Sequence, residues 1–364
     1  MHSAATQPAP PTYVGGCAIK SDLLESHGYD FEIMAPPDDE EQDLEPSVDV
    51  NGDKINFVNQ RCLLMGDSLY QLDYFNWFSD VPQEDETKIM QQCTQLQQTQ
   101  MNEVATHSPC GLLIMEGPPG TRKTIALVHL LLLQFAAGQK VSAHALANGA
   151  TTNLAQRLIS AAEKLYPGKH LIIRMWSDTL ESRIIDRCDP ATIASIITGS
   201  TKSRRQVKYD FHISLAAAVC QIGGLYPTSN PEIINLRDSL EFKPLVDVMQ
   251  VPIADRGPEQ KRTLKHFVHN AIQVIWRLAY AVLSTTTMAG CRWVQQYANL
   301  AEICAIDEAA AATEIEWLIP WRGSKPLALV GGQAQLPPFV ASEGVKYENG
   351  YAATTSTCRV ASRY

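Results

Sequence analysis

A glycine-rich segment between an apolar run and an expected helix carries the clearest chemical signal in this chain. It reads GPPGTRKT over residues 117–124. A tight loop of this kind turns backbone N–H groups toward a phosphate, and the following helix adds the positive end of its dipole. Lys123 has the length to reach the β- and γ-phosphates of a nucleotide, and the Thr124 hydroxyl is a ligand for Mg²⁺. The loop residues that we expect to touch the phosphates are Gly117, Gly120 and Thr121.

One position of this loop departs from the usual pattern. Arg122 stands where phosphate loops usually have glycine, which leaves space for the phosphate and carries no Cβ. An arginine there either crowds the nucleotide or points outward and adds a cation. The sequence leaves both alternatives open, together with a strand–turn–helix that holds no nucleotide.

Two further segments place polar side chains directly after apolar runs. The segment CAIDEAA puts Asp307 where it can join a Mg²⁺ shell and Glu308 where it can polarise the attacking water. The segment LVGGQAQLPP puts the Gln335 amide where it can sense a γ-phosphate. Alone, the first segment also fits a solvated strand end, and the second also fits a polar loop that ends at Pro337-Pro338. Their position downstream of a phosphate loop favours catalytic roles.

The elements that must position these side chains are short apolar strands alternating with helices. The helices are expected over Lys123–Ala137 and Thr151–Leu165. Such alternation is typical of an α/β fold, with a parallel sheet covered by helices on both faces. Strands are expected at Gly111–Glu116, Val141–Ala145, Leu171–Trp176, Ala279–Ser284, Ile303–Ile306 and Leu327–Val330.

Residues 178–275 interrupt the alternation with helix-like, partly basic sequence, which we interpret as an inserted subdomain. Its basic clusters would neutralise nucleic-acid phosphates if they share a face, although surface helices carry such clusters routinely. The clusters are Lys202/Arg204/Arg205/Lys208 and Arg256/Lys261/Arg262/Lys265.

The N-terminal part of the chain is acidic, and the remainder is mildly basic. Residues 1–88 hold 4 Lys/Arg against 18 Asp/Glu, whereas residues 89–364 hold 26 against 21. We expect residues 1–88 to form an acidic, partly disordered extension. A Gln-rich amphipathic helix is expected next, over Lys88–Ala105. The extension is expected to contain a solvated linker at Ala35–Pro46, a small β-rich piece within Asn51–Phe78 and an acidic break starting at Pro82.

Composition excludes several classes of protein. The balance of 45% hydrophobic and 19% charged residues excludes disorder or coiled coil as a description of the whole chain. No apolar run reaches the roughly 18 residues of a membrane span, so no membrane association is expected. Nine scattered cysteines without a C-x-x-C pair indicate reduced thiols in an intracellular protein, cytoplasmic or nuclear.

Taken together, the three chemical segments resemble superfamily 1 RNA/DNA helicases of the nonsense-decay helicase type. The family order is a phosphate loop, a D-E-A strand and G-D-x-x-Q-L-P-P, and the resemblance covers about residues 90–345. Three weaker matches support it. LQQTQ ends at Gln100, like the adenine-reading glutamine motif of the family. ALANGATTNL, with Asn148, and AVLSTT, ending at Thr285 and Thr286, are similar to segments that touch the nucleic-acid backbone.

The resemblance implies a RecA-like P-loop NTPase domain over residues 89–364 that uses ATP and Mg²⁺ and contacts single-stranded RNA or DNA. It covers one RecA-like half of a motor, whose second half supplies arginines to the γ-phosphate. Hydrolysis and unwinding by this chain alone are therefore expected to be weak or absent, with a protein partner supplying the second half as one alternative.

The chain departs from the family pattern at three positions, Arg122 for glycine, Gly332 for aspartate and Thr152 for aspartate. Three interpretations stay open: an ATP-binding motor half, a non-catalytic helicase-like interaction scaffold, and a part of a full ATP-dependent helicase.

Overall fold

The computed structural model describes residues 74–118, 120–197, 210–321 and 325–332. All of them belong to one compact unit that spans residues 48–364. The expectations for the Ala35–Pro46 linker, most of the β-rich piece, the first basic cluster and Gln335 lie outside the described residues. Within these residues, no helix combines the length and hydropathy that a membrane crossing requires.

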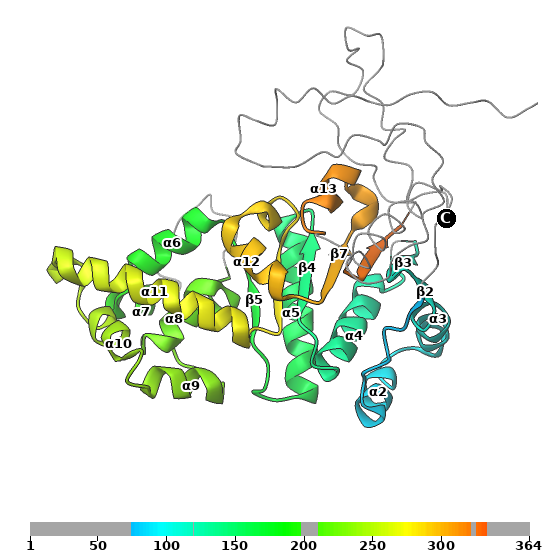
Figure 1. The fold of residues 1–364 in the computed structure, drawn as a ribbon, viewed down its shortest axis with the longest axis horizontal. Coiled ribbons are helices and arrows are strands. Elements are labelled where there is room, and N and C mark those ends of the chain that lie inside the picture. Colours follow the sequence, from blue (N-terminus) through cyan, green and yellow to red (C-terminus); the bar gives the residue numbers. More distant parts are fainter. Residues whose placement is uncertain (1–73, 119, 198–209, 322–324, 333–364) are drawn as a thin grey trace, which may run out of the picture. The chain divides into compact units, whose positions relative to one another are not determined.

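Six parallel strands form the central sheet in the order β3-β8-β7-β4-β6-β5 (Figure 1). Every strand expected from the sequence is present, with small shifts at its ends. Ala145 pairs with Thr285 on one neighbouring strand and with Asp307 on the other. The carboxyl ends of these strands therefore line up at one edge of the sheet. The strands are β3 (Leu112–Glu116), β4 (Val141–Ala145), β5 (Ile172–Arg174), β6 (Ala281–Thr285), β7 (Ile303–Asp307) and β8 (Leu327–Gly331).

One face of the sheet packs against α4 (Lys123–Ala136) and α5 (Asn148–Leu165). Successive side chains of a strand point to opposite faces, so Val141 and Ala143 join this core while the intervening positions point away from it. The helix α4 is apolar nearly all round its buried turns, because α2 (Gln83–Met90) covers it from the other side.

The other face packs against a helical insertion between β5 and β6, as the sequence predicts (Figure 1). The insertion has its own apolar core, which continues onto Ile173 and Val282 of the sheet. Its helices are α6 (Asp178–Asp186), α7 (Pro190–Ile197), α8 (Leu215–Ile222), α9 (Pro231–Asp238), α10 (Lys243–Met249) and α11 (Pro258–Leu278), with 3₁₀ turns η3 (Phe211–Ile213) and η4 (Ile253–Asp255).

The rest of this face is covered by elements that follow β6 and β7. Trp317 and Trp321 pack on Leu112, Ile306 and Leu329 of the sheet. The covering elements are η5 (Met288–Gly290), α12 (Arg292–Leu300), η6 (Ala309–Ala311) and α13 (Glu314–Leu318). Helices therefore lie on both faces, which confirms the predicted α/β architecture.

The single Gln-rich helix expected over Lys88–Ala105 is wrong, because the structure has two helices there, α2 and α3 (Gln95–Ala105). Thr94 starts the second one. Its backbone N–H donates to Gln97 Oε1 at 3.0 Å, and its hydroxyl accepts from the Gln97 N–H at 3.3 Å. This reciprocal capping box ends one helix and begins the next.

The acidic break expected at Pro82 is also wrong, since Pro82 is the N-cap of α2. Three carboxylates, Glu84, Asp85 and Glu86, occupy the first turn, where the helix dipole favours negative charge. Upstream of this helix, a two-stranded antiparallel ladder pairs β1 (Tyr74–Phe75) with β2 (Ser108–Pro109).

Hydrophobic packing continues across the expected domain boundary at residue 88. Trp77 and Phe78 belong to the same core as α4, and the Gln134 side chain donates to the Trp77 carbonyl at 2.8 Å. The division into an acidic extension and a catalytic domain stays a prediction.

Candidate nucleotide-binding site

The glycine-rich loop joins the end of β3 to the start of α4, as its sequence predicts. The Gly117 N–H donates to the Gly331 carbonyl at 3.2 Å, which attaches the loop to β8. A Cβ on Gly117 would lie 2.7 Å from Thr121 Oγ1, and Gly120 has a φ of 86°. The close approach of Thr121 explains the glycine at position 117, and the positive φ explains the glycine at position 120.

Arg122 adopts the left-handed conformation that favours glycine, with φ 61° and ψ 33°. This conformation costs an ordinary L-residue about 1–2 kcal/mol. The Arg122 side chain is exposed and lies on the rim of the cavity described below. The loop backbone therefore has a conformation that glycine adopts without strain, and both alternatives for the Arg122 side chain stay open.

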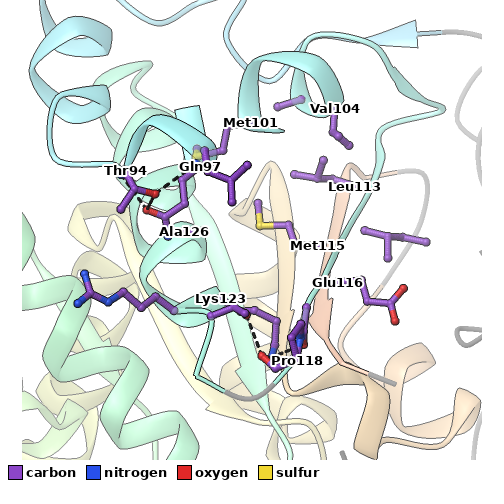
Figure 2. A pocket seen from close by; sticks show the side chains of 16 residues that line it. Thr94, Gln97, Met101, Val104, Leu113, Met115, Glu116, Pro118, Lys123 and Ala126 are labelled. Atoms are coloured by element: carbon purple, nitrogen blue, oxygen red, sulfur yellow. Dashed lines mark hydrogen bonds between the residues drawn. The ribbon is translucent and has the colours of Figure 1, made fainter. Parts of the chain in front are cut away.

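Lys123 is the first residue of α4, and its ammonium group folds back onto the loop. Lys123 Nζ donates to the carbonyls of Gly117 at 2.7 Å and Pro118 at 3.1 Å (Figure 2). This places a positive charge at the N-terminus of a helix, beside loop amides. All of these features favour a phosphate.

Thr124 and Asp307 meet at the foot of the loop. The Thr124 hydroxyl donates to Asp307 Oδ2 at 3.1 Å, and the Glu308 N–H donates to Asp307 Oδ1 at 3.0 Å. A carboxylate and a hydroxyl are the oxygen ligands that Mg²⁺ prefers. The donor set therefore fits the metal that the sequence predicts.

Burial, with the neighbouring Glu308 charge, raises the pKa of Asp307 to about 6. The hydrogen bonds from Thr124 and the Glu308 N–H, and the charge of Lys123, act in the opposite direction. Glu308 itself has a φ of 58° and is half-buried. Three described non-glycine residues have left-handed backbone, and two of them, Arg122 and Glu308, flank this site, while the third is Cys110 before β3. Such strain tends to cluster where function requires it.

A cavity of about 460 Å³ lies between α3, β3, the loop and the start of α4 (Figure 2). One part of its wall is apolar, and the other carries loop residues and charged side chains. This combination suits a ligand with a flat, apolar base and a phosphate chain. The apolar wall includes Leu96, Met101, Val104, Leu113, Met115 and Ala126, and the polar wall includes Thr94, Gln97, Glu116, Thr121, Arg122 and Lys123.

The glutamine that lines the cavity is Gln97. Gln100, for which the sequence predicts the adenine-reading role, lies in α3, and its side chain is outside the described part of the chain. Gln97 serves at the same time as the capping partner of Thr94. The spacing Thr94-x-x-Gln97 was the signal that could have identified this residue from the sequence.

A family model described as an AAA domain matches residues 92–343, which is most of the chain. The match includes the loop, the Asp307 strand and β8. The chain belongs to this family. An AAA domain of this kind is the helicase-type P-loop domain of superfamily 1. The predicted resemblance is confirmed at that level, and the finer assignment to the nonsense-decay type stays a prediction.

The residues of this AAA domain that are expected to touch nucleic acid lie at the same sheet edge as Asp307. Asn148 begins α5, is exposed, and accepts a hydrogen bond from Arg174 Nη2 at 2.6 Å. Thr285 and Thr286 are buried; the Thr285 hydroxyl accepts from the Met288 N–H at 3.3 Å. The structure brings the three residues close to one edge, and their contact with nucleic acid stays a prediction.

Gly332 stands where the family pattern has aspartate, and the structure provides a reason. A Cβ at this position would collide with the Gly117 carbonyl oxygen. That oxygen also accepts the hydrogen bond from Lys123. With the loop in this conformation, only glycine fits at position 332.

Proposed function

We propose that this AAA domain is the ATP-binding half of a superfamily 1 helicase-like motor, binding ATP with Mg²⁺ in the cavity beside the phosphate loop. The observation that carries the proposal is the contact of the Thr124 hydroxyl with the Asp307 carboxylate, 183 residues away, at the foot of that loop. Lys123, which precedes Thr124 in the chain, lines the cavity beside this contact.

In this proposal the phosphates accept hydrogen bonds from the loop amides, and Lys123 moves its ammonium group from the loop carbonyls to the phosphate oxygens. The base lies against the apolar wall formed by α3 and β3. Thr124 and Asp307 would hold Mg²⁺, which neutralises charge on the phosphate oxygens when bound. Glu308 would accept a proton from the attacking water.

Hydrolysis by this chain alone is expected to be slow. Among the described residues that line the cavity, the cationic side chains are Arg122 and Lys123. An additional arginine directed at the γ-phosphate contributes about 10³–10⁵-fold to such reactions. We propose that unwinding likewise depends on arginines supplied by a second RecA-like domain, on the same or another polypeptide.

Nucleotide binding tests this proposal directly. A fluorescent ATP analogue is titrated in the presence and absence of Mg²⁺ into the wild-type chain, Lys123→Ala and Lys164→Ala. The last variant removes an exposed lysine of α5 that does not line the cavity. Saturable, Mg²⁺-dependent binding by wild type and Lys164→Ala is expected, with at least a tenfold loss in Lys123→Ala. Absence of saturable binding by the wild type would overturn the proposal.

A second candidate function is a non-catalytic scaffold, favoured by the unusual Arg122. In that case the wild-type chain does not bind nucleotide, and Arg122→Gly gains saturable binding. The same titration therefore separates the two functions. Contact with single-stranded RNA or DNA is tested by measuring affinity at low and moderate salt, since phosphate contacts make it fall steeply.

A further inference from the structure

The helical insertion contains a second cavity, of about 370 Å³, between α6, α11 and α12. It shares no lining residue with the nucleotide cavity. Its apolar lining includes Ile185 and Ile272, both buried, and the half-buried Trp293. The five other tryptophans are buried: Trp77, Trp176, Trp276, Trp317 and Trp321. Trp293 therefore differs in being an aromatic side chain that borders an open cavity.

The polar lining of this cavity comes from two helices. Ser182 and Asp186 are one turn apart on α6, and Lys265 and His269 are one turn apart on α11. The Asp186, Lys265 and His269 side chains are exposed. None of them forms an ion pair with another described residue.

The basic side of the cavity continues beyond it along α11. Lys261 precedes Lys265 by one turn and is exposed, so Lys261, Lys265 and His269 form a row of about 12 Å on one side of the helix. Arg262 and His266 form an adjacent exposed row. This surface is a line of positive or protonatable groups, and its natural counterpart is a chain of phosphates.

Arg256, which the sequence groups with these cations, does not belong to the surface. It is buried, and its guanidinium donates to the carbonyls of Cys188, Val251 and Met249. The expectation that the four residues of this cluster act together on phosphates is therefore wrong for Arg256. The other three, Lys261, Arg262 and Lys265, are exposed on α11.

We propose that this cavity binds one base of a single-stranded nucleic acid, with Trp293 stacking on the base and the Lys261–Lys265–His269 row contacting the phosphates. Stacking on an aromatic side chain beside a basic track is how proteins hold unpaired strands. The row extends beyond the cavity, which fits a strand with successive phosphates better than a free nucleotide.

Asp186 adds a hydrogen-bond acceptor to this site. A carboxylate accepts hydrogen bonds and does not donate them. The exocyclic amino groups of cytosine, adenine and guanine and the N3–H of uracil and thymine can each donate to it, so the site should bind oligocytidine and oligouridine alike.

The test measures fluorescence anisotropy of short labelled oligocytidine and oligouridine without ATP. Trp293→Leu should weaken oligocytidine binding by about 5- to 150-fold, since base stacking contributes about 1–3 kcal/mol. Lys265→Ala should weaken both strands and reduce the salt dependence. Lys243→Ala, at an exposed position on α10, should change nothing.

Trp293 also packs against the insertion core, so melting curves must accompany the binding data. Trp293→Phe retains an aromatic face and should restore most of the affinity lost in Trp293→Leu. Wild-type affinity in both Lys265→Ala and Trp293→Leu would overturn the proposal, as would absence of oligonucleotide binding by the wild type. Cytidine monophosphate binding as tightly as the oligomer would overturn the strand assignment. The Lys123→Ala variant should bind oligocytidine normally, which separates this site from the ATP site.

Discussion

Thr124 and Asp307 are hydrogen-bonded although one lies in the first turn of the helix after β3 and the other ends β7. Two strands of the sheet, β3 and β7, are separated by β8, so the Thr124 side chain reaches across the end of β8. The contact depends on the parallel register of three strands. The Thr124–Asp307 hydrogen bond therefore forms only when this edge of the sheet is correctly assembled.

Replacing Thr124 with valine should raise the Mg²⁺ concentration that nucleotide binding requires. Valine has nearly the same shape as threonine but no hydroxyl to offer the metal. We expect about a tenfold higher Mg²⁺ concentration for half-maximal nucleotide binding, measured by titrating Mg²⁺ at fixed analogue concentration. Thr87→Val, at an exposed position of α2, serves as the matched control. An unchanged Mg²⁺ requirement in Thr124→Val would contradict the metal role.

Replacing Asp307 with asparagine should stabilise the metal-free protein at neutral pH. The pKa of Asp307 is raised to about 6 in the folded state, mainly by burial, from an ordinary value near 3.8. The ionised carboxylate therefore opposes folding above about pH 6, and this penalty disappears as the pH falls toward 3.8. We expect a gain on the order of 1–3 kcal/mol at pH 7.5 and little gain at pH 4. Thermal melts of both proteins without Mg²⁺ measure the difference, and equal gains at both pH values would contradict the assignment.

His144 should make the protein sensitive to acid. Burial lowers the pKa of His144 to about 3, and its ring nitrogens lie 2.7 Å from Ser142 Oγ and 2.9 Å from Ser284 Oγ. A lowered pKa means that the neutral ring supports folding above about pH 6.5, and this support is lost as the pH falls toward 3.

The measurement is the free energy of unfolding of wild type, His144→Gln and the exposed control His266→Gln between pH 7 and 4. His144→Gln should lower stability by about 2–4 kcal/mol at pH 7, because a buried hydrogen-bond network is disturbed. It should also show a shallower loss of stability on acidification. A wild-type pH profile in His144→Gln would show that the ring does not control acid sensitivity.

Substitutions of Arg122 should separate the effect of its backbone strain on stability from the effect of its charge on ATP affinity. Arg122→Gly releases the left-handed strain and should raise stability by about 1 kcal/mol, reduced by the greater freedom of glycine in the unfolded chain. Arg122→Ala keeps the strain and removes the cation. If the proposed motor function holds, ATP affinity should change less than tenfold in both variants. A gain of stability in Arg122→Ala equal to that in Arg122→Gly would contradict the strain argument.

The strands were predictable because each lies in a short, mostly apolar run of the sequence. Val141–Ala145 was predicted with the observed bounds, and Ile303–Ile306 differs from β7 only by the addition of Asp307. Buried parallel strands leave this signal in the sequence, since both of their faces must be apolar.

Other features depend on contacts that a linear pattern does not contain. The capping box at Thr94 starts a new helix within the stretch for which the sequence predicts a single one. Arg256 lies among basic residues in the sequence, yet its side chain is buried. It donates hydrogen bonds to backbone carbonyls of α10 and of the residues after α6. The collision that excludes a side chain at Gly332 becomes visible only when β8 and the loop are brought together.

The position of β4 between β6 and β7 has a mechanical consequence. Its last residue, Ala145, is the rung between Thr285 on one side and Asp307 on the other, and the Thr286 N–H donates to its carbonyl at 3.1 Å. A displacement of β7, which carries Asp307, is thus transmitted through β4 alone to β6, which carries Thr285. The chain leads from that same backbone, within three residues, to Asn148. The strand that ends at Asp307 and the strand that ends at Thr285 are both hydrogen-bonded to β4, and β4 leads to Asn148. A shift of either strand therefore strains the other.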